Sequence, residues 1–236
     1  MLQFVNQNTL SDYLNNDWID RDLHQLLQNS DRLFTSDKWL LNSPPKRCIF
    51  DLLYKDLIQT KECLRVLDVG GGLSCFACSK FHSIYYEVLD LFHHESDESL
   101  RSLQKSFSSV KFSHRDWQEF DFKDKYDLVI ANDIFPNVDQ RLDEFIEKFS
   151  PHTKEIRFSL TYYNQRRAYK VKRVDADEIF FIRPWNGEQV RSALEPCHET
   201  FEESIIKELL YGTESVFENG RQVCTFFMKG TLADER

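Results

Sequence analysis

Three glycines stand side by side at Gly70, Gly71 and Gly72, directly after the run Val66–Val69. A short β-branched and leucine run that ends in consecutive glycines is typical of a buried parallel strand that turns sharply into a helix. Glycine is needed at such a turn where φ is positive, or where a ligand approaches the backbone without meeting a Cβ. Asp68, near the end of that strand, adds a carboxylate at the mouth of the site. The pattern predicts a binding site for a small molecule.

Two other nucleotide-binding motifs do not match these glycines. The dinucleotide fingerprint G-x-G-x-x-G requires glycine at position 75, which is Cys75 here. A phosphate-binding P-loop ends in Gly-Lys-Ser/Thr, and the tripeptide Leu73-Ser74-Cys75 does not supply that ending. A structural turn without any ligand stays open as the alternative interpretation of the glycines taken alone.

The string LRVLDVGGGLSCFA, residues 64–77, resembles the first motif of class I S-adenosylmethionine-dependent methyltransferases, which reads acid-x-Gly-x-Gly-x-Gly. The acid is Asp68, the first two glycines are Gly70 and Gly72, and Ser74 replaces the last glycine. The resemblance implies a doubly wound, Rossmann-like α/β fold. It also implies S-adenosyl-L-methionine as the cofactor, held around Asp68 and all three glycines, and methyltransferase activity.

Two further positions match the family in order and spacing. Asp90 ends the expected second strand, where the resemblance implies that a carboxylate binds the ribose hydroxyls and that Leu91 lies beside the adenine. Asp116 follows the third strand, where the family places an acid that bonds the adenine amino group, and Trp117 adds a backbone donor or a ring wall. A solvated aspartate at a strand end remains the alternative for Asp90 by itself.

Asn132 and Asp133 follow the expected fourth strand, at the place where the family's fourth motif lines the meeting point of methyl donor and acceptor. In-line methyl transfer mainly requires an acceptor that is held close to the methyl carbon and aligned with it. Where the acceptor is a hydroxyl, a positioned base assists by taking its proton. Asp133 is the predicted base, with Tyr163 as a second catalytic candidate, and Asn132 is assigned to the cofactor.

A basic and aromatic segment, residues 161–173, follows the expected fifth strand in a chain that is otherwise acidic. The resemblance places this segment as a loop over the acceptor pocket. Arg166 and Arg167 are predicted to bind a phosphate or carboxylate, because arginine forks match such anions. Tyr162 is predicted to stack on a sugar or base. The hypothesis is a small anionic acceptor, such as a nucleotide-linked sugar or a glycan, and a solvated charged connection is the alternative.

The elements that must position these residues alternate along the middle of the chain. Strands are expected over residues 66–69, 84–89, 110–112, 126–131 and 155–160, and helices over residues 76–81, 95–107 and 139–149. Such alternation indicates a parallel sheet with right-handed crossovers. Asn219-Gly220 between two apolar runs, residues 215–217 and 223–227, predicts a terminal antiparallel hairpin. The expected fold is a doubly wound, mostly parallel sheet of seven strands that ends in this hairpin.

The chain is expected to form a single domain over residues 1–236, with a helical extension at residues 1–62. Residues 63–160 are the predicted cofactor-binding half, and residues 161–236 contain the acceptor-side loop, a helix and the hairpin. Within the extension, Ser11 is the expected cap of a first helix, and Ser43 before two prolines predicts the start of a second. Residues 31–42 between them are expected to be a loop.

Composition limits the class of protein. The chain is 41% hydrophobic and 29% charged, as is usual for a soluble globular protein, and its phenylalanine-rich runs, such as residues 179–182, are expected in the core. No apolar stretch is long enough to span a membrane, no secretion signal is visible, and the six cysteines form no framework, which favours the cytoplasm. No metal site is predicted.

The net charge of −9 argues against a general nucleic-acid binder. The leading hypothesis is transfer of a methyl group to an oxygen or nitrogen of a small acceptor. An RNA methyltransferase that uses the basic segment is the first alternative, and a non-catalytic binding protein of methyltransferase fold is the second. The sequence does not identify the acceptor atom or the oligomeric state.

Overall fold

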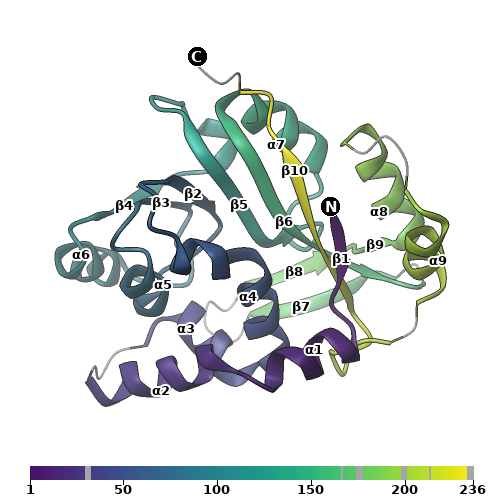
Figure 1. Ribbon diagram of the computed structural model, residues 1–236, viewed down its shortest axis with the longest axis horizontal. Coiled ribbons are helices and arrows are strands. Elements are labelled where there is room, and N and C mark those ends of the chain that lie inside the picture. The colour runs from purple at the N-terminus through teal and green to yellow at the C-terminus, as the bar shows by residue number, and fades with distance from the viewer. Residues whose placement is uncertain (30–32, 166, 174–177, 198–200, 213, 233–236) are drawn as a thin grey trace.

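A computed structural model describes residues 1–29, 33–165, 167–173, 178–197, 201–212 and 214–232. Among these residues the central sheet has the strand order β1-β10-β6-β5-β2-β3-β4, with β9 paired to β6 (Figure 1). The strands are β1 (Leu2–Phe4), β2 (Arg65–Val69), β3 (Tyr85–Asp90), β4 (Val110–His114), β5 (Tyr126–Phe135), β6 (Thr153–Tyr163), β9 (Trp185–Asn186) and β10 (Gln222–Lys229). The neighbouring strands β4, β3, β2, β5 and β6 pair in parallel in that order, whereas β10 is antiparallel to both of its neighbours, β6 and β1. The predicted mostly parallel α/β sheet is confirmed, although this sheet has eight strands among the described residues rather than the predicted seven, with β10 as an antiparallel C-terminal strand.

Helices cover both faces of this sheet (Figure 1). Those that pack on the first face are α1 (Gln7–Leu14), α2 (Trp18–Asn29), α3 (Thr35–Asn42), α4 (Pro44–Gln59), α5 (Cys75–Lys80) and α6 (Asp97–Ser106). Those on the second face are α7 (Leu142–Phe149), α8 (Gly187–Leu194) and α9 (Glu203–Tyr211). No described helix is long and apolar enough to cross a membrane.

Successive residues of the central strands alternate between two hydrophobic cores. In β5, Leu128 and Ile130 join the core beneath α1–α6, and Val129 and Ala131 join the core beneath α7–α9. Side chains of a strand point to opposite faces in turn, so a strand that is covered on both faces is apolar throughout. This is why the continuous apolar runs correctly predicted the central strands.

The N-terminal extension is helical as predicted, with two differences. Ser43 caps α4 by accepting a hydrogen bond from the Lys46 backbone N–H at 3.4 Å, as expected. Ser11 lies within α1, however, and the cap of that helix is Asn6, whose side chain accepts from the Thr9 N–H. The expected loop at residues 31–42 instead contains α3, which begins at Thr35. A buried aspartate, Asp37, bonds the Phe34 N–H and so stabilises the first turn of that helix.

The predicted terminal hairpin is wrong in its first strand. The Asn219-Gly220 turn is present, with Gly220 at a φ of +75°, but residues 215–217 form no strand. The Ser215 hydroxyl accepts from the Phe217 N–H and donates to the Arg221 carbonyl, so local side-chain bonds replace a ladder. The N-terminal strand β1 pairs with β10 instead, in the register Leu2 opposite Phe226.

The segment after β6 also differs from the expected loop. Residues Tyr169–Arg173 form β7, which pairs with β8 (Glu178–Ile182) in a separate two-stranded antiparallel sheet. Because this small sheet has an uncovered face, Ile179 and Phe181 are 53% and 78% exposed and do not join the core that the sequence predicted for them. Ile182 is buried.

We expect Arg157→Met to lower the free energy of unfolding by about 1–3 kcal/mol, because a buried polar link is removed. Arg157 lies in β6, is 7% exposed, and donates to the Leu53 carbonyl and to Asp56 of α4. The matched control is Lys154→Met on the same strand, whose exposed ion pair with Asp127 contributes below about 1 kcal/mol. Urea denaturation measures both, and equal losses would contradict a structural role for the Arg157 link.

Candidate active site

The glycine turn follows β2 and has the backbone conformation that the sequence predicted. Gly70 has a φ of +72° and Gly72 a φ of +66°, in the left-handed region that favours glycine. The Gly70 N–H donates to the Leu89 carbonyl at 2.8 Å, which ties the turn to β3. A Cβ on Gly71 would lie 2.7 Å from the Asp68 carboxylate. Glycine is therefore required at Gly71 because the Asp68 side chain packs against the turn.

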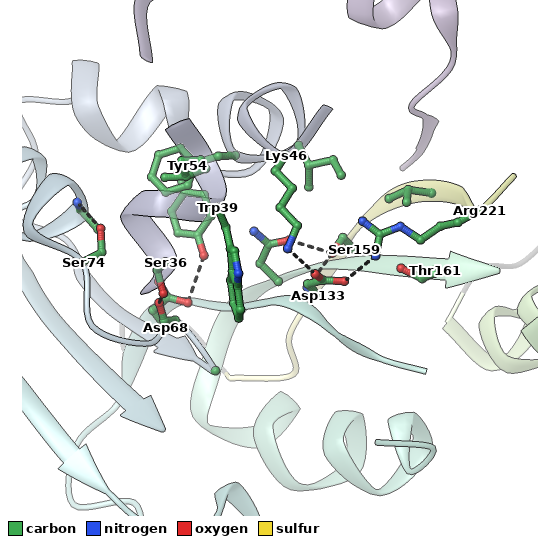
Figure 2. A pocket seen from close by; sticks show the side chains of 18 residues that line it. Ser36, Trp39, Lys46, Tyr54, Asp68, Ser74, Asp133, Ser159, Thr161 and Arg221 are labelled. Carbon is green, nitrogen blue, oxygen red and sulfur yellow. Dashed lines mark hydrogen bonds and ion pairs between the residues drawn. The ribbon is translucent and has the colours of Figure 1, made fainter. Parts of the chain in front are cut away.

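A cavity opens beside this turn, with an empty volume of about 740 Å3 that includes its solvent-filled mouth. Helices α3 and α4 form one wall, and the ends of β2, β5 and β6 with the residue before β10 form the other (Figure 2). Gly70, Gly71 and Asp68 line it near the turn, and Asp133 and Arg221 line it at the other end. In the view of Figure 2, the Trp39 indole lies between Asp68 and Asp133.

Asp68 is 2% exposed and accepts hydrogen bonds from two tyrosine hydroxyls. Tyr54 of α4 donates to its carboxylate at 3.0 Å, and Tyr86 of β3 donates to the other oxygen. Burial raises the pKa of Asp68 to about 7, the nearby Asp90 charge adds to this rise, and the two tyrosine bonds oppose it. Asp68 is thus partly protonated near neutral pH.

Asp90 holds the glycine turn from the end of β3. Its Oδ2 accepts the Gly72 N–H at 3.0 Å, and its Oδ1 accepts the Phe92 N–H at 2.6 Å. Leu91 beside it is 39% exposed, at the same edge of the sheet. Gly72, Asp90 and Leu91 do not line the cavity described above, so their predicted contacts with a cofactor remain predictions.

Ser74, which stands where the family motif has glycine, caps α5. Its Oγ accepts from the Ala77 N–H at 2.9 Å and donates to Asp37 at 2.6 Å. Asp37 also accepts from the Cys75 and Phe76 N–H groups at 3.0 and 3.1 Å. Burial raises the pKa of Asp37, and these donors oppose the rise. The serine therefore joins the N-terminus of α5 to α3.

The Trp117 indole does not form the predicted ring wall of an adenine site, and the alternative role of Trp117 as a backbone donor remains a prediction. Its indole is 7% exposed and packs edge-on against Phe145 in the core beneath α7, while its Nε1 donates to Asp139 at 2.9 Å. Asp116 caps the short 3-10 helix that follows β4 by accepting the Gln118 N–H. Its predicted bond to an adenine amino group remains a prediction.

Asp133 lies between two cations at the end of the cavity away from the glycine turn (Figure 2). Its Oδ2 is 3.2 Å from Lys46 Nζ, and its Oδ1 is 3.7 Å from an Arg221 guanidinium nitrogen. Asn137 donates to it at 2.7 Å. These groups hold the pKa of Asp133 below its usual value against the effect of desolvation. A carboxylate of lowered pKa is a weak base, so the structure argues against the predicted role of Asp133 as general base.

The backbone around Asp133 is fixed by its neighbours. Asp133 has a φ of +60°, and its N–H donates to the Ser159 hydroxyl at 2.8 Å. That hydroxyl donates in turn to the Asn132 side-chain oxygen at 2.8 Å. Asn132 lines the cavity and its side-chain oxygen accepts this bond, and its predicted contact with the cofactor remains a prediction.

The other predicted acceptor-side residues are separated from one another. Tyr162 is 2% exposed in the core beneath α7–α9, on the face opposite the cavity, so its predicted contact with an acceptor is wrong. Tyr163 is buried, with its hydroxyl 3.4 Å from the Tyr169 hydroxyl, and its catalytic role stays a prediction. The Arg167 guanidinium stacks on the Tyr163 ring and donates to the Asn219 carbonyl. Arg166 lies outside the described residues.

Sequence reasoning missed several residues of the cavity, namely Ser36, Lys46, Tyr54, Ser159, Thr161 and Arg221. One signal could have found two of them. Arg157, Ser159 and Thr161 are polar at every second position of an otherwise apolar strand, which indicates one polar face. Among the described residues, no group of histidine, cysteine and acidic side chains could hold a metal ion.

No protein-family model and no curated protein matches this sequence. Solved structures to which the chain is similar include coclaurine N-methyltransferase bound to N-methylheliamine and S-adenosylhomocysteine, at 15% identity and a TM-score of 0.47, over 79% of this chain and 73% of that chain. A phosphoethanolamine N-methyltransferase of Haemonchus contortus is 14% identical, with a TM-score of 0.49, over 77% of this chain and 52% of that chain. The structure of Thermoplasma acidophilum 1320 is 14% identical, with a TM-score of 0.44, over 90% of this chain and 98% of that chain.

We expect Ser74→Ala to lower the free energy of unfolding by roughly 2–3 kcal/mol, because a helix cap and a bond to a buried carboxylate are lost together. Ser96→Ala is the control, since Ser96 caps α6 without contacting a buried aspartate, and we expect it to cost about 1 kcal/mol. Chemical denaturation of both variants measures the difference. Equal losses would show that the Ser74–Asp37 bond adds nothing to stability.

The raised pKa of Asp68 predicts a pH-dependent stability. The folded pKa of about 7 exceeds the usual value of 3.8, so the folded state binds the extra proton between these values. The stabilisation that this proton gives to the folded state is fully present below about pH 4 and is lost as pH rises through about 7. The loss in the free energy of unfolding is roughly 4 kcal/mol at most. The free energy of unfolding of the wild type minus that of Asp68→Asn should be smaller at pH 7.5 than at pH 4.5, as measured by denaturation at both pH values. A constant difference would contradict the shift.

Proposed function

We propose that this protein transfers the methyl group of S-adenosylmethionine to an oxygen or nitrogen of a small-molecule acceptor. The observation that carries the proposal is the bare glycine turn at one end of an open cavity, with carboxylates at the tips of the adjacent strands β2 and β3. Ligands of open α/β sheets bind at the carboxyl ends of the strands, and this cavity lies there.

The residues around the turn suit a nucleoside that bears an amino-acid tail. Each carboxylate oxygen of Asp90 already accepts one backbone N–H, and a carboxylate has about four acceptor sites. Capacity therefore remains for two ribose hydroxyls. Gly70 and Gly71 offer backbone that a ligand can approach closely, and Asp68 lies beneath them in the wall of the cavity. We assign the cofactor to Asp68, Gly70, Gly71 and Asp90.

Bound S-adenosylmethionine supplies a methyl group on a sulfonium, which is already a good leaving group. The protein's main task is then to hold an acceptor in line and to exclude water. The helices α3 and α4 cover one side of the cavity, and Trp39 projects from α3 into it. An acceptor amine that arrives unprotonated needs no further group, whereas a hydroxyl needs a base. Tyr163 is retained as the candidate for that base.

Binding of S-adenosylhomocysteine tests the proposal without knowledge of the acceptor. At one hundred times its dissociation constant, we expect the ligand to stabilise the protein by about 2.7 kcal/mol. Asp90→Asn replaces an acceptor oxygen by a donor, so we expect its affinity for the ligand to fall about ten-fold or more. Thermal-shift titration and calorimetry measure both effects.

Asp97→Asn is the control, because Asp97 is an exposed residue in the first turn of α6. It should bind S-adenosylhomocysteine as the wild type does, and NAD should stabilise neither protein. A wild type that S-adenosylhomocysteine leaves unchanged would refute the proposed cofactor. Stabilisation that Asp90→Asn fully retains would refute the assigned role of Asp90.

A further inference from the structure

Two basic side chains converge on one carboxylate at the end of the cavity away from the glycine turn, and this inference rests on the function proposed above. Lys46 of α4 and Arg221, next to β10, both contact Asp133. Their side chains are 26% and 13% exposed, and all three residues line the cavity. Figure 2 shows the three charged groups directed toward one another.

The charges in this cluster do not balance. Two cations face one carboxylate, so the cluster carries a net positive charge at the cavity surface. The guanidinium nitrogen of Arg221 lies 3.7 Å from Asp133 Oδ1, which is longer than a hydrogen bond. The buried Nε of Arg221 has no hydrogen-bond partner among the described residues. The donors of the guanidinium are therefore not saturated by Asp133. An anion with two oxygens matches such a fork.

Both cations are held in place by aromatic rings. The Arg221 guanidinium lies 3.9 Å from the centre of the Phe217 ring, and Lys46 Nζ lies 4.4 Å from the centre of a Trp39 ring. Asp133 is fixed between them by its backbone bond to Ser159 and by Asn137. A charge that is oriented before a ligand arrives costs less entropy when the ligand binds. Asp133 acts here as a positioning residue.

The location assigns this cluster to the acceptor rather than to the nucleoside. The sheet order places β10 and β6 beyond β5, whereas the glycine turn and Asp90 follow β2 and β3 on the other side of β5. Arg221 stands next to Thr161 at the β6–β10 end of the cavity (Figure 2). The arginine that the sequence predicted for this task, Arg167, is stacked on Tyr163 and is not part of the cavity wall.

We infer that Lys46 and Arg221 form an anion subsite that binds a carboxylate or phosphate group of the methyl acceptor, with Asp133 fixing the position of both cations. The acceptor is then a small molecule with an anionic group next to the nitrogen or oxygen that is methylated. The carboxylate of the cofactor's own tail has the same chemistry, so the experiment must separate the two sources.

The first arm of the experiment measures inorganic phosphate binding in the presence of saturating S-adenosylhomocysteine, by thermal shift at constant ionic strength set with chloride. We expect saturable stabilisation of the wild type. Arg221→Gln and Lys46→Gln should each weaken phosphate binding at least about ten-fold, because a charge-assisted bond is lost. Arg191→Gln on α8 is the control for loss of an arginine outside the cavity and should bind phosphate as the wild type does. Arg167→Gln should also leave phosphate binding unchanged.

The second arm compares S-adenosylhomocysteine with 5′-methylthioadenosine, which is the same nucleoside without the amino-acid tail. We expect Arg221→Gln and Lys46→Gln to bind both compounds as the wild type does. If the two variants weaken S-adenosylhomocysteine but not 5′-methylthioadenosine, the subsite belongs to the cofactor tail and the acceptor assignment is wrong. If Arg221→Gln does not fold, Lys46→Gln decides the result.

Three results would overturn the anion subsite. These are a wild type that phosphate does not stabilise beyond chloride, variants that retain wild-type phosphate affinity, and an Arg167→Gln variant that loses phosphate binding while Arg221→Gln keeps it. The proposed function fails separately. Suppose that neither the wild type nor any variant binds S-adenosylhomocysteine, while phosphate binding to the protein alone still depends on Lys46 and Arg221. The anion subsite then stands and the methyltransferase proposal falls.

Discussion

One buried carboxylate, that of Asp37, connects the start of helix α3 with the start of helix α5. Asp37 accepts the Phe34 N–H at the start of α3 and the Cys75 and Phe76 N–H groups at the start of α5. Negative charge is favourable at helix N-termini, where backbone donors are otherwise unsatisfied, so a single side chain stabilises two helices. Because α3 is held there, its residue Trp39 lines the cavity beside the glycine turn. The cavity wall depends on this bond network.

Strand ends were the predictable part of the fold and of the site. A parallel strand that is buried on both faces has a local signature, and its last residues fall at one edge of the sheet. Asp68, Asp90 and Asp133 could therefore be placed from the order of the apolar runs. The cavity residues contributed by α3, α4 and the segment before β10 could not. Lys46 meets Asp133 across 87 positions of sequence, and no local pattern encodes such a contact.

The errors have physical causes that lie beyond local sequence. Tyr162 is adjacent to Thr161, yet one step along a strand moves a side chain to the opposite face, so Tyr162 enters the other core. The hairpin failed because β1, from the far end of the chain, occupies the edge of β10. Asp133 was predicted to take a proton, but the neighbouring cations lower its pKa and so favour the ionised carboxylate. In each case tertiary contacts decided between locally equivalent options.

The tyrosine-bonded Asp68 has a consequence for ligand affinity. Because burial raises its pKa to about 7, Asp68 can gain or lose a proton near neutral pH. A positively charged group seated nearby interacts more favourably with the ionised carboxylate, so its arrival expels a proton into the solvent. By linkage, affinity for such a cation rises with alkalinity and levels off once the residue has lost its proton. Acidification would thus weaken the binding of such a cation beside Asp68.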